Sequence, residues 1–484
     1  MRLLIEKIDA LYTCDDRRSV LKHAWIVVEN GKIAALGEHD SPDGDFDERI
    51  DLSGSIAMPG FVNAHHHFFQ TLTRALPRAQ RGQLMDWLRV LYPVWSAMSP
   101  DDLAAAAAAS ASELLLTGAT TSVDHFYLVP RCDPSYVDAE VAAARSAGLR
   151  LHLVRGSMTA IEGDLEHVLS ESLGPRAGGI IDEPGPVLAD MRRMIERYHD
   201  ASDGSMLTVA LGPTTPTYDD LGFLRAVAKL AAEAGVGIHM HVHPQDRERA
   251  LCRKRFGRTP IEVVDGAGIL GTRTWLAHAT RLDSDDMALL ADRGVGVAHC
   301  PRMILRLGAR IPRIHDMIVS GMRVAVGVDG AASNDSGSML GEMRLALLLH
   351  RLCNGGGEVS PDAWLTPHNV LVMATRVTAD LIGRSDIGQI TPGFCADITA
   401  FDMRGIGFAG ARADLLSGLL LAGDDTRASL TMVAGRPLVR DGRLLLHDEH
   451  ALREKVDRAA ERLVAHMTSI TGVDYCDFGG QAGH

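Results

Sequence analysis

The chain has 484 residues, 46% of them hydrophobic and 23% charged, so it can bury a large core. The formal net charge of −13 and the lack of a long basic run argue against nucleic acid as a partner. No apolar run reaches the roughly 18 residues of a membrane span, and the apolar N-terminal stretch is interrupted by acids, unlike a signal peptide. The seven cysteines are scattered without CxxC spacing, so we expect a reduced, cytoplasmic protein.

At both ends of the chain the sequence pattern predicts short strands joined by tight turns. In the first 55 residues, Asn30 and Gly31 predict a hairpin between two alternating apolar runs. The same pattern returns at residues 388–402 and 428–446. We therefore predict a small β-sandwich domain made from residues 1–58 and 388–446.

The middle of the chain alternates short β-branched runs with longer amphipathic or alanine-rich segments. One such helix is expected over 99–118, with Ser99 as N-cap and Gly118 as its stop. The number of β units matches an α/β fold of the distorted (β/α)8 TIM barrel type over 59–387. The region 447–484 is predicted to hold an amphipathic helix at 449–470, followed by a tail. The eight predicted strands are 60–65, 120–125, 150–156, 207–213, 235–241, 273–278, 294–299 and 323–329.

Chemically capable side chains stand at the ends of several of these strands. In such a barrel the carboxyl ends of the strands form one rim, where active sites lie. His65 and His67 are two residues apart and so point to the same side, as a metal-chelating pair requires. A single buried histidine is most often a hydrogen-bonded core residue, but successive strand ends have no structural reason to share this chemistry. We therefore predict a metal site from the joint pattern, whose other members are His239, His241, His278, His299 and Asp329.

Roles other than metal binding are expected for some of the histidines. His152 and His299 are assigned roles in the structure or in supporting the metal ligands, and His239, which lies on the same face as His241, is assigned a structural role. The sequence leaves open whether His125 lines the pocket or packs in the core.

Several motifs resemble the amidohydrolase superfamily. They are "PGFVNAHHHFFQTLTRAL", "LAHA", "GVAHCP" and "GVDGAASNDSGSML". Within the superfamily they are most similar to the branch of 8-oxoguanine, guanine and pterin deaminases and s-triazine hydrolases. The resemblance runs from about residue 1 to 445 and implies a distorted barrel flanked by a β-sandwich, in agreement with the pattern of strands.

The resemblance also implies a ligand set and a mechanism. One divalent metal, zinc with iron as the alternative, would be bound by His65, His67, His241 and Asp329. His278, together with Asp329, would accept a proton from the water that the metal activates. The residues expected to contact the substrate are Gln70, Trp87, Tyr92 and Arg155; core packing is the alternative for the two aromatic residues.

The sequence departs from the family pattern after the fifth strand. Deaminases of this kind keep a glutamate three residues after the metal-binding histidine of that strand, and here that place is Pro244. His243, which can titrate, is the better candidate to replace this proton carrier, and Gln245 is the other. Asp246 and Glu248 are expected to be solvated charges.

A second departure follows the seventh strand, where Arg302, Arg306 and Arg310 are spaced four apart. On a helix they would lie along one side. They are either a solvated basic face or, with Arg302 and Arg306 in the pocket, a clamp for an acidic group of the substrate.

The leading functional hypothesis is a metal-dependent hydrolase of C–N bonds in a nitrogen heterocycle, most simply a deaminase of a purine, pterin or triazine. One alternative is a related hydrolase that releases an alkylamine or halide or opens a cyclic amide. Another is a metal-containing binding protein without catalysis. The expected partner is a small heterocycle, not a membrane or nucleic acid, and a homodimer or higher homo-oligomer is expected because dimers are the commonest assemblies.

Overall fold

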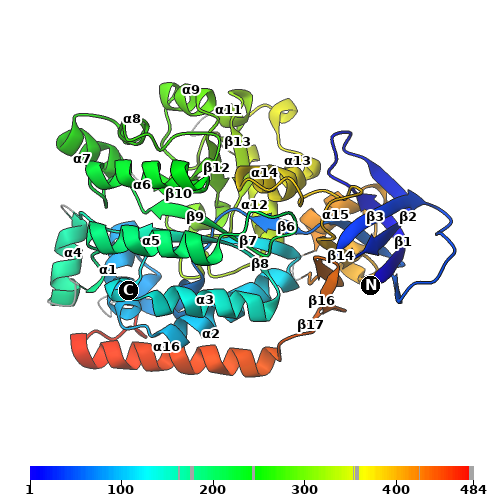
Figure 1. Ribbon diagram of the computed structural model, residues 1–484, viewed down its shortest axis with the longest axis horizontal. Coiled ribbons are helices and arrows are strands. Elements are labelled where there is room, and N and C mark those ends of the chain that lie inside the picture. Colours follow the sequence, from blue (N-terminus) through cyan, green and yellow to red (C-terminus); the bar gives the residue numbers. More distant parts are fainter. Residues whose placement is uncertain are drawn as a thin grey trace, which may run out of the picture.

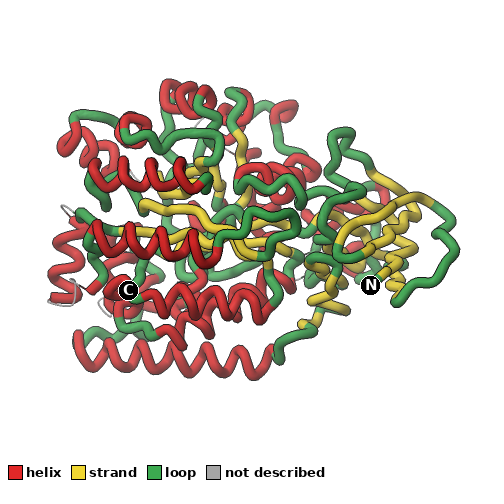
Figure 2. Tube along the Cα trace, viewed as in Figure 1, coloured by secondary structure: helices red, strands yellow, loops and turns green. Residues whose placement is uncertain are grey.

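The computed structural model describes residues 1–161, 164–174, 179–242, 246–352, 354, 359–423 and 426–478. Most strands lie in the interior, with helices around them, and a separate group of strands forms the end of the molecule that carries the N-terminus (Figures 1 and 2).

A barrel of eight parallel strands occupies the centre of the larger part of the molecule. The strands neighbour one another in chain order, and a 3.0 Å hydrogen bond from Ala64 N–H to the Val326 carbonyl links the first to the last. All eight strands predicted from the sequence are present. They are β6 (Phe61–Asn63), β7 (Ala119–Phe126), β8 (Arg150–Ser157), β9 (Leu207–Pro213), β10 (Gly237–Val242), β11 (Thr274–His278), β12 (Gly296–His299) and β13 (Arg323–Val326).

Helices cover the outside of the barrel (Figure 1). The predicted helix after Ser99 is α2, and its N-terminus is closed by a capping box in which the Ser99 and Asp102 side chains each accept from the other's backbone N–H. The helices of this part are α1 (Leu84–Ser96), α2 (Pro100–Leu116), α3 (Pro134–Ala147), α4 (Asp164–Leu173), α5 (Pro184–Tyr198), α6 (Leu221–Ala234), α7 (Asp246–Phe256), α8 (Pro260–Gly266), α9 (Ser284–Asp292), α10 (Pro301–Arg306), α11 (Ile314–Val319), α12 (Met339–Leu352), α13 (Pro367–Val372) and α14 (Thr378–Leu381).

The second sheet is mixed and combines strands from both ends of the chain. Its centre is the antiparallel pair of β5 and β14, in which Ala57 lies opposite Ala400. It has its own apolar core, which includes Leu3, Ile26 and Met432. Its strands are β1 (Arg2–Tyr12), β2 (Val20–Glu29), β3 (Lys32–Glu38), β4 (Glu48–Asp51), β5 (Ser55–Pro59), β14 (Ile398–Asp402), β15 (Leu430–Val433), β16 (Arg436–Arg440) and β17 (Arg443–Leu444), and the short helix α15 (Leu415–Ala422) lies between β14 and β15.

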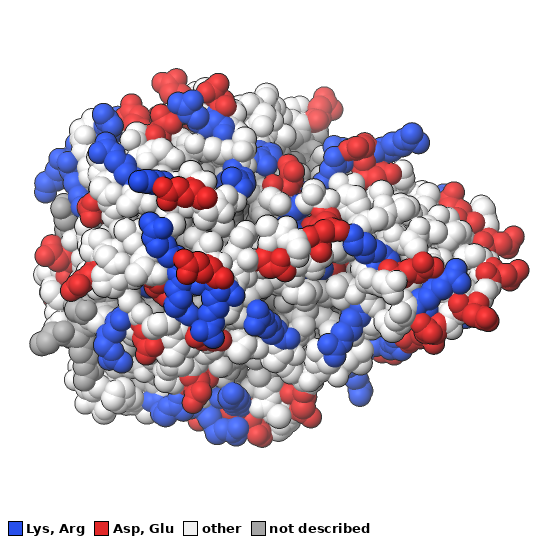
Figure 3. All heavy atoms as spheres, in the orientation of Figure 1, with Lys and Arg blue, Asp and Glu red and all other residues white. Residues whose placement is uncertain are grey.

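The last helix, α16 (Glu449–Thr471), covers the range 449–470 that the sequence predicts. It runs along the outside of the barrel beside α2, and Arg462 forms an ion pair with Asp102 there (Figure 1). Acidic and basic side chains are interspersed on the face drawn in Figure 3. Among the described residues, no helix combines the length and the apolar character needed to cross a bilayer.

Candidate functional site

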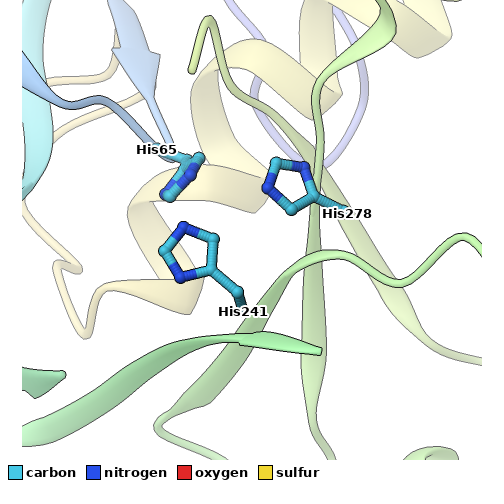
Figure 4. Close-up of side chains that lie close together, drawn as sticks. All are labelled: His65, His241 and His278. Atoms are coloured by element: carbon cyan, nitrogen blue, oxygen red, sulfur yellow. The ribbon is translucent and has the colours of Figure 1, made fainter. Parts of the chain in front are cut away.

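The predicted metal-binding side chains come together at the carboxyl ends of the barrel strands. His65 and His67 follow β6, and His241 is the second-last residue of β10. His278 ends β11, and Asp329 follows β13. Figure 4 shows the rings of His65, His241 and His278 around one common space. The side chains of all five residues are buried.

Hydrogen bonds to carbonyl groups fix the tautomers of His67 and His241. A carbonyl oxygen only accepts, so His67 Nδ1–H donates to the His125 carbonyl at 2.6 Å and His241 Nδ1–H donates to the Thr214 carbonyl at 3.0 Å. In a neutral imidazole the other nitrogen then carries a lone pair. The two Nε2 atoms lie 3.2 Å apart, so two lone pairs face each other with no proton between them.

His65 is oriented through a chain of two histidines. His239 Nδ1–H donates to the Trp275 carbonyl at 2.8 Å, so His239 Nε2 accepts from His65 Nδ1–H at 2.7 Å. This leaves a lone pair on His65 Nε2, which lies 3.3 Å from Asp329 Oδ1. His239 thus positions the ring of His65.

The same carboxylate oxygen is 3.3 Å from His67 Nε2. Burial lowers the pKa of His65, His67 and His241 below the ordinary 6.5, so the three rings are neutral at pH 7. Three neutral nitrogen lone pairs and a carboxylate therefore converge without a donor among them. Such an arrangement is repulsive unless a cation occupies its centre, and neutral imidazole and carboxylate are ligands of zinc-like ions. The residues present fit a divalent metal.

Asp329 and His278 both have backbone conformations in the left-handed region, with φ of 60° and 72°. Residues with side chains rarely adopt it, and such positions cluster at functional sites. The carboxylate of Asp329 is held by the N–H of Gly330 at 2.8 Å and the hydroxyl of Ser333 at 2.9 Å. Burial lowers the pKa of His278 to about 4, so this ring is also neutral and can accept a proton.

A pocket opens beside His67, His241, His278 and Asp329. Gln70, Trp87 and Tyr92, which the sequence assigned to the substrate, line it. Trp87 Nε1–H is fixed by the Ala332 carbonyl at 3.1 Å, close in the chain to Asp329. Several lining residues were not predicted from the sequence, because they lie in loops or on helix faces that carry no motif; they are Leu84, Leu88, Tyr127, Thr214, Thr215, Tyr218, Met303, Leu307, Ala309 and Ser333. For Tyr127 a signal was available, since it directly follows the strand that carries His125.

The predicted arginines lie elsewhere. Arg155 is fully buried, with Nε 2.9 Å from Asp190 Oδ2, and it does not line the pocket. Arg302 contacts Glu342 at 3.2 Å and Arg306 contacts Asp335 at 2.8 Å. Helix α10 turns Met303 and Leu307 toward the pocket instead.

The expectation that three arginines align along one helix was wrong for the third. Helix α10 ends at Arg306, so Arg310 lies beyond it. The helix ends early because its last turn leads into Leu307 and Gly308, and Gly308 has a φ of 63°.

The segment after β10 is described only in part. His243, Pro244 and Gln245 lie outside the described residues. Asp246 is exposed, as expected, and contacts Arg281 at 3.2 Å. The expectation of a solvated Glu248 was wrong, because this residue is only 7% exposed within the first turn of α7.

The remaining histidines lie away from the pocket lining. His152 contacts the Thr208 hydroxyl at 2.6 Å and His299 contacts His350, with 3.2 Å between their Nε2 atoms. These contacts agree with the structural roles assigned to both. His125 is buried beneath the ligand cluster and does not line the pocket.

Comparison with known proteins identifies the family. Residues 56–438 match the model of the amidohydrolase family, so the chain belongs to that family. It is a hydrolase with a nearly closed eight-stranded barrel and a site whose buried histidines and aspartate can hold a metal.

Two relatives and one solved structure are similar to this chain over nearly its whole length. An 8-oxoguanine deaminase of Pseudomonas aeruginosa is 37% identical over 446 residues, which cover 91% of this chain and 95% of the relative. A hydroxydechloroatrazine ethylaminohydrolase of Pseudomonas sp. (strain ADP) is 33% identical, with 96% and 98% covered. The crystal structure of an atrazine chlorohydrolase from Arthrobacter aurescens TC1 in complex with zinc is 32% identical, with a TM-score of 0.87 and 95% and 100% covered.

Proposed function

We propose that the protein is a metal-dependent aminohydrolase that removes an exocyclic amine from a purine-, pterin- or triazine-like ring. The observation that carries the proposal is the convergence of three histidine lone pairs and the Asp329 carboxylate. His65, His67, His241 and Asp329 would hold one divalent ion, zinc most simply, as in the zinc complex of the atrazine chlorohydrolase.

The ion, when bound, lowers the pKa of an adjacent water toward neutrality. His278 and Asp329 border the same space, and each can accept the proton that the water loses as it adds to a ring carbon. His278, once protonated, would return a proton to the leaving nitrogen. His243, which lies outside the described residues, is our second candidate for that proton transfer.

The pocket favours a flat, partly polar substrate. Trp87, Tyr92 and Tyr127 offer aromatic surfaces, and Gln70 offers an amide that can donate to or accept from a ring edge.

A substrate panel tests this function. Purified protein loaded with zinc is offered amino-substituted purines, pterins and triazines, and the products are identified by mass spectrometry together with an ammonia assay. The proposal expects ammonia from at least one ring class, and no product when zinc is removed by a chelator. Zinc-loaded protein that converts none of these rings would contradict it.

A second candidate function follows from one departure in sequence. Pro244 stands where the deaminases keep a glutamate, and a proline side chain cannot carry a proton. A halide leaves as an anion without accepting a proton, so its release needs no such proton carrier, and a relative at 33% identity is named an ethylaminohydrolase. Release of ethylamine or chloride from N-alkylated or chlorinated triazines, without ammonia from their amino analogues, would favour this candidate.

A further inference from the structure

His125 lies at the end of β7, beneath the ligand cluster, and the proposed mechanism does not use it. Its side chain is fully buried. The centre of its ring is 4.8 Å from that of His241 and 5.7 Å from that of His67. Its backbone is tied to the first strand end, since His125 N–H donates to the His66 carbonyl at 2.8 Å.

Neither ring nitrogen of His125 has a hydrogen-bond partner among the described residues. A buried polar group without a partner is costly, and most buried side-chain nitrogens have one. The other histidines of the cluster show the contrast, because Nδ1 of His65, His67 and His241 is bonded in each case. A buried imidazole with neither nitrogen bonded indicates a ligand that those hydrogen bonds do not represent.

The barrel makes room for this ring with a pair of glycines. Gly156 on β8 lies opposite Gly212 on β9. A Cβ atom at Gly212 would lie 2.7 Å from His125 Nε2, and one at Gly156 would lie 2.9 Å from its Cε1. Larger residues at these two places would displace the imidazole from the cluster.

His67, His125 and His241 place one nitrogen each within 4.8 Å of one another. A neutral imidazole carries one lone pair, and neither ring nitrogen of His125 is engaged by another described residue. We propose that these three histidines form a second position for the divalent ion, deeper in the barrel than the position bounded by His65 and Asp329.

The two positions exclude each other. Both need Nε2 of His67 and of His241, and each of these nitrogens has one lone pair. The site therefore holds one ion at a time, either beside Asp329 and His278 or beside His125. An ion in the deeper position lacks the carboxylate that the proposed reaction needs, so this position would retain the metal without activating water for the reaction.

The test removes Asp329, and with it the position bounded by His65 and Asp329, and asks whether the protein still binds an ion. Binding of Co²⁺ is measured by its visible absorption and by competition with a chelator in Asp329→Ala and in Asp329→Ala/His125→Phe. Asp329→Ala is expected to bind one Co²⁺, and the double variant to bind it at least tenfold more weakly. Asp329→Ala/His152→Phe, which removes a buried histidine bonded to Thr208 outside the cluster, should bind like Asp329→Ala. Equal binding with and without His125 would overturn the proposal.

A measurement on the unaltered protein covers the case in which the variants do not fold. Crystals of the wild-type chain grown at several Zn²⁺ concentrations are examined by anomalous scattering at the zinc edge. The inference expects partial density between His67, His125 and His241 in addition to density beside Asp329. Density only beside Asp329 at every concentration would overturn the inference and leave the proposed function intact, whereas no density at either place would contradict both.

Discussion

The imidazole of His278 differs from the ligand histidines in its bonding. Its Nδ1 is buried without a hydrogen-bond partner among the described residues, and its ring borders the pocket together with Asp329. Its low pKa keeps it neutral at pH 7. These features suit a group that accepts a proton during the reaction better than one that holds the ion.

Replacing this ring should therefore separate catalysis from metal binding. We expect His278→Asn to lower kcat by about 10²- to 10⁴-fold, the usual contribution of a general base, with zinc content unchanged. His299→Asn, at the end of the neighbouring strand and bonded to His350, should keep kcat near that of the wild type. Steady-state kinetics and elemental analysis of the same samples give both quantities. A near-normal kcat for His278→Asn would remove this residue from the mechanism.

The guanidinium of Arg306 is bonded to other residues of the protein, so we expect this residue to contribute to the free energy of unfolding and not to substrate binding. Its Nε contacts Asp335, and its guanidinium also donates to the Gln80 carbonyl at 3.4 Å. Arg306→Met should lower the free energy of unfolding by about 1–3 kcal/mol through these lost bonds. KM should change equally for acidic and neutral analogues. A rise in KM confined to acidic analogues would instead support an anion clamp.

At the scale of elements, the strand ends were predictable because two simple rules apply. Apolar β-branched runs mark buried parallel strands, and their carboxyl ends share one rim. His65, His67, His241, His278 and Asp329 were placed together on that basis. The bonding of each ring was not predictable, because it depends on carbonyl groups such as those of His125 and Trp275 on neighbouring strands.

Loops and short helices account for what the sequence did not show. Tyr127 and Tyr218 reach the pocket from segments without periodicity, and Glu248 is buried although its surroundings in sequence are charged. The spacing of the α10 arginines does not reveal that Arg302 pairs with Glu342 and Arg306 with Asp335, so their contacts could not be predicted.

The contact of α3 with β7 contains two buried carboxyl groups. Burial raises the pKa of Asp124 to about 7 and that of Glu140 well above its ordinary value, and the negative charge of Asp124 adds to the rise for Glu140. Asp124 Oδ1 also accepts the N–H of Phe68 at 2.6 Å, next to the ligand His67. In the unfolded chain both acids ionise near pH 4, so the folded state binds more protons and loses stability as the pH rises through 7.

Glu140→Gln should reduce this loss. One of the two acids that resist ionisation is gone in this variant. We expect the fall in stability from pH 6 to pH 9 to be smaller in the variant by about 1.4 kcal/mol or more, the equivalent of one pKa unit. Denaturant unfolding at the two pH values measures it, with Glu461→Gln on the exposed face of α16 as control. If the free energy of unfolding falls equally with pH in wild type and variant, the ionisation of Glu140 does not affect the stability of the fold.

At the scale of the whole molecule, the barrel brings five residues from four strand ends into one buried cluster, and α1 and α10 add the walls of the pocket. The separate sheet contributes no residue to the pocket lining. The side chains that could hold a metal and the pocket beside them thus lie at one end of the barrel.

The most direct test of this account is a zinc titration of chelator-treated protein, with ammonia or amine release followed on the best substrate of the panel. We predict that the rate rises in proportion to added zinc and reaches a plateau near one equivalent per chain, because the two ion positions exclude each other. A rate that is independent of zinc, or a chain that binds no zinc, would contradict the account.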